Sequence, residues 1–343
     1  MNYRIVATLG PATRGPDVWK GLLAAGADAF RLNTSHMNLA TLEGWLGELI
    51  AFHRRLAAGE AGGAAPPVIL DLQASKWRIG SIPRIELPAG QKVELVAGGI
   101  DGEQRQSSAA VVIPVPHPDF FTAARSSGGE IALNDAKVML RIESMDSERI
   151  VARVERGGEI SSAKGITIAA SPYRIERLSA KDRRIVELGS RYPNVRFALS
   201  YLKDAAEMSN YRRLLDPSLF LIAKVERAGA LQEVERIAEI ADELWICRGD
   251  LGAEMGMALM AAELSAFSQR ISRLSKPILL AGQVLEHMSE HPEPTRSEIS
   301  CLYDALRDGY AGVVLSDETA VGAFSESACR AAALFRGNRL LGG

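Results

Sequence analysis

The sequence alternates short β-rich runs with longer stretches of helical periodicity, and this alternation restricts the fold more than any other feature. Eight aliphatic runs are predicted as strands, at residues 5–8, 29–33, 68–72, 197–200, 220–225, 243–247, 277–281 and 312–316. Amphipathic stretches separate most of them, for example residues 42–56, 230–240 and 297–306. Such alternation is typical of parallel βαβ units, and eight units predict an α/β fold closed as a (β/α)8 TIM barrel.

The connection between the third and fourth runs is too long for a single helix. It contains strand-like segments broken by turns, at residues 84–87, 92–96, 138–142 and 150–154. We predict a small all-β cap domain over residues 77–165, inserted after the third barrel strand, with the barrel formed by residues 1–76 and 166–343. The cap would leave the barrel at the face that carries TIM-barrel active sites. Ser179 is predicted to cap the helix that follows, over residues 180–192.

Composition excludes several classes of protein. A net charge of −2 and a hydrophobic content of 47% do not suit a nucleic-acid-binding surface. The cysteines Cys247, Cys301 and Cys329 lack metal-ligand spacing, and no apolar run reaches the roughly 20 residues of a membrane-spanning helix. The N-terminus shows no apolar leader, so we expect a cytoplasmic protein whose partners are small molecules, not nucleic acid or membrane.

Charged residues gather where two predicted strands end. Lys224 and Glu226 stand two residues apart on one strand and so project to the same side, and Asp250 follows the next strand. Two carboxylates and an ammonium can therefore converge, and hard oxygen ligands of this kind suit Mg²⁺ or Mn²⁺. The alternative is a buried ion pair between Lys224 and Glu226 that serves only as scaffolding.

Six motifs, in order along the chain, resemble the pyruvate kinase family. They are residues 5–12 (IVATLGPA), 31–36 (RLNTSH), 70–71 (LD), 223–226 (AKVE), 248–252 (RGDLG) and 294–298 (PTRSE). The similarity continues through residues 315–320 (LSDETA) and so covers essentially the whole chain. The resemblance implies a kinase that moves a phosphoryl group between phosphoenolpyruvate and ADP, giving pyruvate and ATP.

The resemblance also implies roles for the residues that match the motifs. Glu226 and Asp250 match the family's metal ligands. Lys224 matches the lysine that stabilises the phosphoryl group in flight, and Arg31 the phosphate-contacting arginine. Phosphoryl transfer passes through a loose transition state, so positioning and charge neutralisation supply most of the catalysis. The remaining expected substrate positions are Gly249 and Ser200, and the expected nucleotide positions are Arg78, Lys164 and His36.

A monovalent-cation site is implied at Asn33, Ser35, Asp71 and the carbonyl of Leu72. Lys76 stands where potassium-dependent members carry a glutamate, and potassium-independent members resemble this chain in carrying lysine. A fixed ammonium would supply the positive charge that K⁺ otherwise brings. We therefore expect activity with Mg²⁺ or Mn²⁺ and no requirement for K⁺.

The chain departs from the family pattern at several places. Gly282 replaces a threonine whose hydroxyl lies beside the pyruvate methyl group in the proton relay to the enolate. Either the space admits a larger 2-oxo acid or its enol phosphate, or water replaces the hydroxyl and turnover slows. Residues 72–78 (LQASKWR) lack the family's Gly-Pro turn and one basic residue, and residues 36–41 lack an aromatic that stacks near adenine.

The chain ends at Gly343, so we expect it to lack the family's C-terminal regulatory domain and to form a homo-oligomer through barrel contacts. Two other functions stay open. A metal-dependent lyase or aldolase acting on a 2-oxo acid enolate is favoured by Gly282 and opposed by Lys224. A catalytically idle descendant is opposed by the presence of Lys224, Glu226 and Asp250.

Overall fold

The computed structural model describes residues 1–59, 65–74, 76–98, 111–134, 136–168 and 178–337. The chain forms two compact units. The barrel unit comprises residues 1–74, 178–248 and 262–343, and the cap unit comprises residues 75–177 and 249–261.

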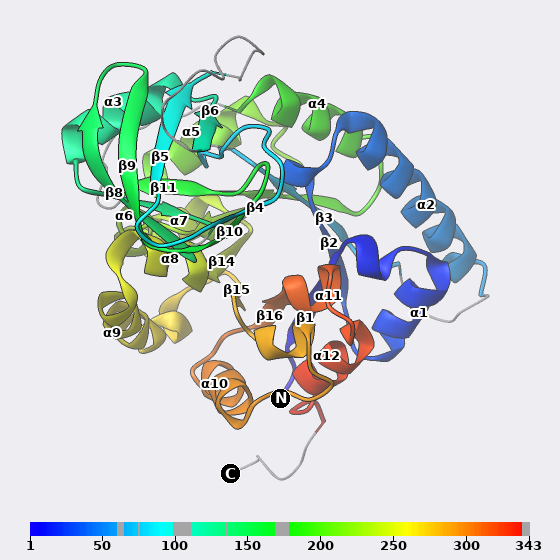
Figure 1. The fold of residues 1–343 in the computed structure, drawn as a ribbon. Helices are drawn as coiled ribbons and strands as arrows, with labels where there is room; N and C mark the ends of the chain where they lie inside the picture. The colour runs from blue at the N-terminus through cyan, green and yellow to red at the C-terminus, as the bar shows by residue number, and fades with distance from the viewer. Residues whose placement is uncertain (60–64, 75, 99–110, 135, 169–177, 338–343) are drawn as a thin grey trace. The chain divides into compact units, whose positions relative to one another are not determined.

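A closed barrel of eight parallel strands forms the centre of the barrel unit (Figure 1). The strands follow one another around the barrel in chain order, and the last strand pairs back with the first. Their bounds are β1 Arg4–Leu9, β2 Ala29–Asn33, β3 Val68–Leu72, β12 Val195–Leu199, β13 Phe220–Val225, β14 Glu243–Cys247, β15 Ile278–Ala281 and β16 Gly312–Leu315. Each predicted run matches one of these strands to within two residues at either end, so the (β/α)8 prediction is confirmed.

Helices connect the barrel strands, and four of those described begin at a side chain that caps the first turn. The side chains of Asn38, Ser179, Asp204 and Thr295 each accept a hydrogen bond from a backbone N–H in the first turn of the helix that follows. The helices are α1 Pro16–Ala24, α2 Leu39–Ala57, α4 Ala180–Gly189, α5 Ala205–Leu214, α6 Ala228–Gln232, α7 Val234–Ile240, α8 Arg248–Met255, α9 Met257–Ser268, α10 Arg296–Arg307, α11 Asp317–Ala320 and α12 Ser325–Ala332. Short 3₁₀ turns are η1 Pro11–Thr13, η2 Thr34–His36, η3 Ile271–Arg273 and η4 Glu286–Ser289.

One predicted helix is interrupted. Residues 230–240 fall on α6 and α7, which meet at Glu233, where the backbone leaves helical geometry (φ −103°, ψ 18°). The Glu233 carboxylate accepts a hydrogen bond from the backbone N–H of Ala205 (3.1 Å), so it is engaged with the start of α5.

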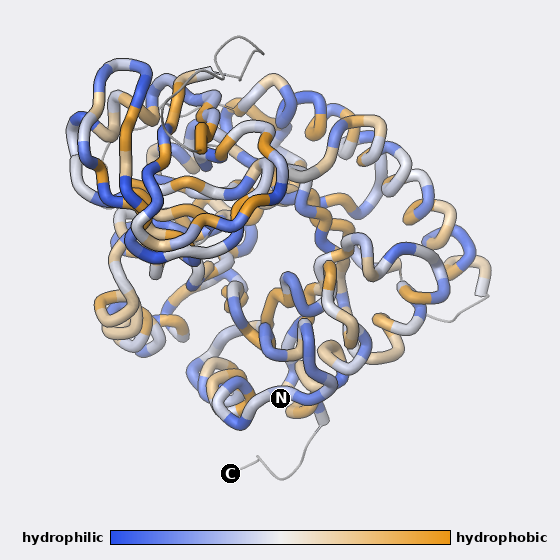
Figure 2. Tube along the Cα trace, viewed as in Figure 1, coloured by the Kyte–Doolittle hydropathy of each residue, from blue (hydrophilic) through white to orange (hydrophobic). Residues whose placement is uncertain are grey.

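Apolar side chains fill the inside of the barrel. A buried cluster includes Val6, Ile69, Ile222, Trp245 and Val314, all from barrel strands. Helices α2 and α4 alternate polar and apolar residues along their length (Figure 2). In these two helices the pattern places one face on the barrel and one in water. Among the described residues, no helix combines the length and the apolar content needed to cross a bilayer.

The cap unit is built on a curled sheet of six strands in the order β11-β7-β8-β9-β5-β6, with a separate pair formed by β4 and β10. Their bounds are β4 Ile85–Leu87, β5 Lys92–Ala97, β6 Val111–Val115, β7 Glu130–Leu133, β8 Val138–Met145, β9 Arg149–Arg156, β10 Gly158–Ile160 and β11 Ile166–Ile168. Helix α3 Pro118–Ser127 packs with this sheet, and most of α8 and the start of α9 also belong to the cap unit. Phe120 of α3 packs edge-on against Trp77, at 5.4 Å between ring centroids, within the apolar core of the cap.

Candidate active site

Asp71, at the end of β3, is the centre of a buried charge network at the carboxyl ends of the barrel strands. Arg31 of β2 donates two hydrogen bonds to Asp71 Oδ2, from Nε (2.8 Å) and Nη2 (2.6 Å). Ser200 Oγ donates to Asp71 Oδ1 (2.9 Å). Arg31 Nη1 also donates to Thr8 Oγ1 (2.9 Å), which anchors the guanidinium to β1.

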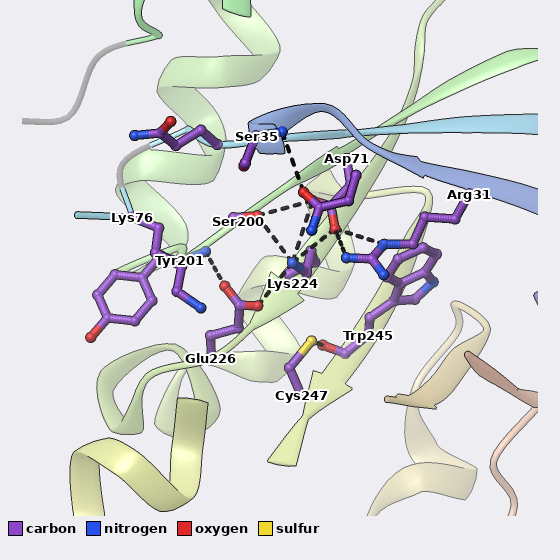
Figure 3. A network of polar contacts seen from close by, with 12 residues as sticks. Arg31, Ser35, Asp71, Lys76, Ser200, Tyr201, Lys224, Glu226, Trp245 and Cys247 are labelled. Atoms are coloured by element: carbon purple, nitrogen blue, oxygen red, sulfur yellow. Dashed lines mark hydrogen bonds and ion pairs between the residues drawn. The ribbon is translucent and has the colours of Figure 1, made fainter. Parts of the chain in front are cut away.

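Lys224 joins this network from β13. Its Nζ lies 3.0 Å from Asp71 Oδ2, 3.0 Å from Ser200 Oγ and 2.9 Å from Glu226 Oε1. Figure 3 shows Arg31, Ser200 and Lys224 converging on Asp71. Glu226 lies on the same side as Lys224, as their spacing predicts, and its Oε2 accepts a hydrogen bond from the backbone N–H of Tyr201 (2.5 Å).

Burial and charge act in opposite directions on these groups. Burial raises the pKa of Asp71, but Lys224 and Arg31 outweigh it and hold that pKa well below the usual range. Burial lowers the pKa of Lys224, yet Asp71 and Glu226 raise it above its ordinary value. The carboxylate and the ammonium are therefore both ionised at neutral pH.

The turn η2 follows β2 and is hydrogen-bonded to the backbone carbonyl of Asp71. Thr34 Oγ1 donates to the carbonyl oxygen of Asp71 (2.7 Å), and Asn33 Oδ1 accepts from the N–H of Ser35 (3.3 Å). Lys181 of α4 donates to the carbonyl oxygens of Thr34 (2.8 Å) and Ser35 (3.3 Å). Of the expected cation-site residues, Asn33, Ser35 and Asp71 are therefore brought together.

The turn after β15 has an unusual backbone. Gly282 adopts a φ of +83° and Gln283 a φ of +52°, both in the left-handed region. Arg248 holds the turn by donating to the carbonyl oxygens of Gly282 (3.0 Å) and Gln283 (2.7 Å). A β-branched residue such as threonine would be strained at position 282. The left-handed backbone therefore favours glycine at position 282, and glycine carries no hydroxyl.

The cap unit contains other expected site residues. Lys76 lies 2.7 Å from both carboxylate oxygens of Asp250, which is buried in the first turn of α8, directly after Gly249. Arg78 Nη1 donates to the carbonyl oxygen of Ala163 (2.7 Å), next to Lys164. The side chain of His36 lies outside the described residues.

The two expected metal ligands have donor chemistry that fits a divalent cation. Glu226 and Asp250 are both buried carboxylates, and each faces an ammonium, that of Lys224 and that of Lys76 respectively. Carboxylate oxygens are hard donors of the kind that Mg²⁺ or Mn²⁺ takes as ligands. Among the residues that the structure describes, no group of three or more His, Cys, Asp or Glu side chains is arranged to hold a metal.

The sequence predicted that Arg31, Lys224, Glu226 and Ser200 belong to one site, but it did not predict several of their partners. Thr8, the N–H of Tyr201 and Lys181 were not predicted as parts of the site. Thr8 and Tyr201 were accessible from the motifs, since each stands at a strand end or directly follows a predicted site residue. Lys181 carries no such signal, because only the packing of α4 brings it to η2.

The buried cluster of alternating charges lies at the carboxyl ends of the barrel strands, where TIM-barrel enzymes carry their active sites, so fold and site together define the TIM-barrel class. The family model for the pyruvate kinase barrel domain matches residues 1–329. The chain therefore belongs to the pyruvate kinase family.

Relatives named pyruvate kinase come from distant organisms. One from Agrobacterium vitis is 34% identical over 324 residues, which is 94% of this chain and 64% of the relative. One from Methylorubrum extorquens is 32% identical (94% and 65%), and one from Thermococcus litoralis is 30% identical (94% and 66%). The chain thus spans a little under two thirds of the length of these relatives.

Proposed function

We propose that the chain is a phosphotransferase that moves a phosphoryl group between phosphoenolpyruvate, or a related enol phosphate, and ADP. The observation that carries the proposal is the pairing of two cations, Arg31 and Lys224, on the buried carboxylate of Asp71. Asp71 keeps both cations ionised and fixed before substrate arrives. A rigid pair of cations is what a loose phosphoryl-transfer transition state requires, because its charge is spread over several oxygens.

Each site residue has a distinct part in the proposal. Lys224 and Arg31 bind the phosphoryl oxygens, and Ser200 and the region of Gly249 orient the three-carbon part of the substrate. Arg78, Lys164 and His36 contact the nucleotide. Glu226 and Asp250 hold a divalent cation, which when bound neutralises phosphate charge and aligns the two substrates.

The site differs from the family pattern in the group that delivers a proton to the enolate. Gly282 offers no hydroxyl, so in the proposal a water molecule donates the proton and turnover is slow with phosphoenolpyruvate. The space left at Gly282 instead favours an enol phosphate with a substituent larger than hydrogen at the terminal carbon. Comparing phosphoenolpyruvate with its methyl-substituted homologue separates these two consequences.

Independence of K⁺ is part of the proposal and is supported by the fixed ammonium of Lys76. A cytoplasmic location and assembly into a homo-oligomer are proposed with it. The exposed apolar side chains of Met257 (68%) and Leu259 (52%) on α9 support the assembly, because contacts between copies would cover them.

The activity is tested by incubating the protein with phosphoenolpyruvate, ADP and Mg²⁺ in KCl or in tetramethylammonium chloride, and following pyruvate. We expect equal rates in both salts. Lys224→Met should lower kcat by about 10²–10³, the range found when one transition-state donor is lost. Lys20→Met, which removes an exposed lysine of α1, is the matched control and should keep the wild-type rate.

A second function, a metal-dependent lyase or aldolase acting on a 2-oxo acid enolate, is favoured by the open position at Gly282 and opposed by Lys224. In the same experiment it predicts no pyruvate from phosphoenolpyruvate and ADP. It predicts instead that pyruvate and an aldehyde condense in the presence of Mg²⁺. That outcome would replace the phosphotransferase proposal.

A further inference from the structure

Two histidine side chains stack on each other at the turn η4, in the segment that leads from β15 to α10. His287 lies within η4, and His291 follows four residues later. Their ring centroids are 3.8 Å apart and their ring planes differ by 5°. Both residues are exposed, so the stack faces solvent and is not part of an apolar core. The two imidazoles are therefore presented side by side to anything that approaches from solution.

The backbone that carries the two histidines is fixed by hydrogen bonds. The N–H of His291 donates to the carbonyl oxygen of His287 (3.1 Å), which closes one helical turn and places both side chains on the same side. The N–H of His287 donates to Glu298 Oε1 (2.9 Å). The other oxygen of that carboxylate accepts from the N–H of Thr295 (2.8 Å) at the start of α10. The pair therefore stands on a backbone that is ordered without any ligand.

The ring of His291 is also held in a defined orientation. Its Nδ1 donates to the carbonyl oxygen of His287 (3.2 Å). A carbonyl oxygen can only accept, so in the neutral ring Nδ1 carries the proton and Nε2 carries the free lone pair. Histidines that bind metals are typically held in this way, with the second ring nitrogen donating to a backbone carbonyl or a carboxylate. His291 therefore has its Nε2 prepared as a donor to a metal.

The spacing of the two rings also suits a shared ion. Zn–N bonds measure about 2.0–2.1 Å, so two nitrogens bound to one tetrahedral Zn²⁺ lie roughly 3.3 Å apart. The stacked rings of His287 and His291 already have centroids 3.8 Å apart. A tilt of one ring is therefore enough to direct both nitrogens at one ion. Packing alone explains the stack less well, because at an exposed position it removes little apolar surface from water.

We propose that His287 and His291 form a binding site for a nitrogen-preferring divalent transition metal, with water molecules as the remaining ligands. Imidazole suits Zn²⁺, Cu²⁺ and Ni²⁺, whereas Mg²⁺ and Mn²⁺ prefer oxygen ligands such as those of Glu226 and Asp250. The bound ion would cross-link residues 287 and 291, within the segment that connects the turn at Gly282 to α10. This site does not depend on the proposed phosphotransferase activity.

The test compares Zn²⁺ binding by wild type, His287→Phe, His291→Phe and His53→Phe, measured by calorimetry in excess Mg²⁺. The phenyl ring keeps the stack but removes the nitrogen donors, and Mg²⁺ competes at oxygen sites without competing for imidazole. His53→Phe is the matched control, because it makes the same change on α2, where the ring neighbours Phe52 and not another histidine. Electron paramagnetic resonance of bound Cu²⁺ then counts the nitrogen donors in each protein.

We expect His287→Phe and His291→Phe each to bind Zn²⁺ at least tenfold more weakly than wild type, since losing even an outer partner of a metal-bound histidine costs roughly 10–100-fold in affinity. His53→Phe should bind as wild type does. Bound Cu²⁺ should show two nitrogen donors in wild type and in His53→Phe, and one in each of the other variants.

The inference is overturned if wild type binds no Zn²⁺, or if both variants at the stack bind it as tightly as wild type. It is also overturned if only one of them loses affinity, because the ion would then be held by a single histidine. A wild-type protein that makes no pyruvate would contradict the proposed function, and the Zn²⁺ and Cu²⁺ measurements would still decide the role of the histidine pair.

Discussion

At the scale of single residues, the candidate site is balanced in charge before any substrate arrives. Arg31 and Lys224 carry two positive charges, and Asp71 and Glu226 carry two negative charges. Lys76 and Asp250 form another neutral pair in the cap unit. Under the proposed function, a phosphorylated substrate would bring negative charge that these neutral pairs do not offset, which is why the proposal includes a divalent cation and the nucleotide-side residues Arg78 and Lys164.

Asp71→Asn tests how strongly this balance stabilises the fold. The substitution leaves Arg31 and Lys224 buried with one fewer carboxylate, and removing one partner of a buried ion pair costs about 3–5 kcal/mol. We expect the free energy of unfolding, measured with urea at pH 7, to fall by that amount. Asp317→Asn, which changes an exposed carboxylate, should alter it by less than about 0.5 kcal/mol.

The effect of Asp71→Asn should also depend on pH. The folded-state pKa of Asp71 lies below its unfolded value, so its stabilising contribution is complete above about pH 4 and is lost as the pH falls further. The difference in stability between wild type and the variant should therefore be largest at neutral pH and shrink below about pH 4. A difference that stays constant down to pH 3 would show that Asp71 is not the titrating group.

Sequence alone predicted which residues gather but not how they pair. Alternation along β13 placed Lys224 and Glu226 on one side, because a strand's side chains repeat every two residues. Asp71 was expected at a cation site, and its two hydrogen bonds with Arg31 were not predicted. The sequence also showed the missing hydroxyl at Gly282 but not its left-handed backbone, because glycine adopts positive and negative φ with similar ease.

At the scale of elements, the strands and helices that were predicted well are those with strong periodicity or clear caps. The cap unit was predicted less completely, with β6, β7, β10, β11 and α3 missed. Pro114 interrupts the apolar run of β6, and β10 and β11 have only three residues each. A signal for α3 was present, because Pro118 and Asp119 stand at its first turn, where both residue types are favoured.

Glu318 shows how one residue can connect elements. It lies in α11, is buried, and accepts hydrogen bonds from the N–H of Leu285 (2.9 Å) after β15 and of Ser316 (2.6 Å) after β16. Burial raises its pKa, while these backbone N–H groups oppose that rise. The carboxylate has acceptors on both sides, which no neutral side chain of the same shape provides.

Glu318→Gln should therefore weaken the connection between the loops that follow β15 and β16. The amide presents a donor to one of the two backbone N–H groups and leaves it without an acceptor, which costs about 1–3 kcal/mol in a buried place. Urea unfolding at pH 7 measures the loss, with Asp317→Asn as the neighbouring exposed control. An unchanged free energy of unfolding in Glu318→Gln would mean that the loops hold their positions without this carboxylate.

At the scale of the whole molecule, the barrel depends on pairing between the two ends of the chain. Strand β1 pairs in parallel with β16, in a register that joins Arg4 to Gly312 and Ala7 to Leu315. Counting eight runs predicted closure, but the register of this seam could not be read from the sequence, because it is set by contacts between residues about 300 positions apart.

Gly312 makes this seam sensitive to a single methyl group. A Cβ at position 312 would overlap the carbonyl oxygen of Arg4, which is backbone and can move only if β1 separates from β16. We expect Gly312→Ala to cost about 3 kcal/mol, at the upper end for overpacking, and to weaken amide protection in β1 and β16 before that of other strands. Hydrogen exchange measures this directly.

The control for Gly312→Ala is Gly44→Ala, in the exposed face of α2, where an added Cβ meets nothing within 4 Å. Alanine is the better helix former, so this variant should be more stable than wild type by roughly 0.5–1 kcal/mol. The same substitution would then lower the stability at position 312 and raise it at position 44. If Gly312→Ala were neutral or stabilising, β1 and β16 would have to pair less closely than the described register requires. Closure of the barrel would then not be what holds Thr8 beside Arg31.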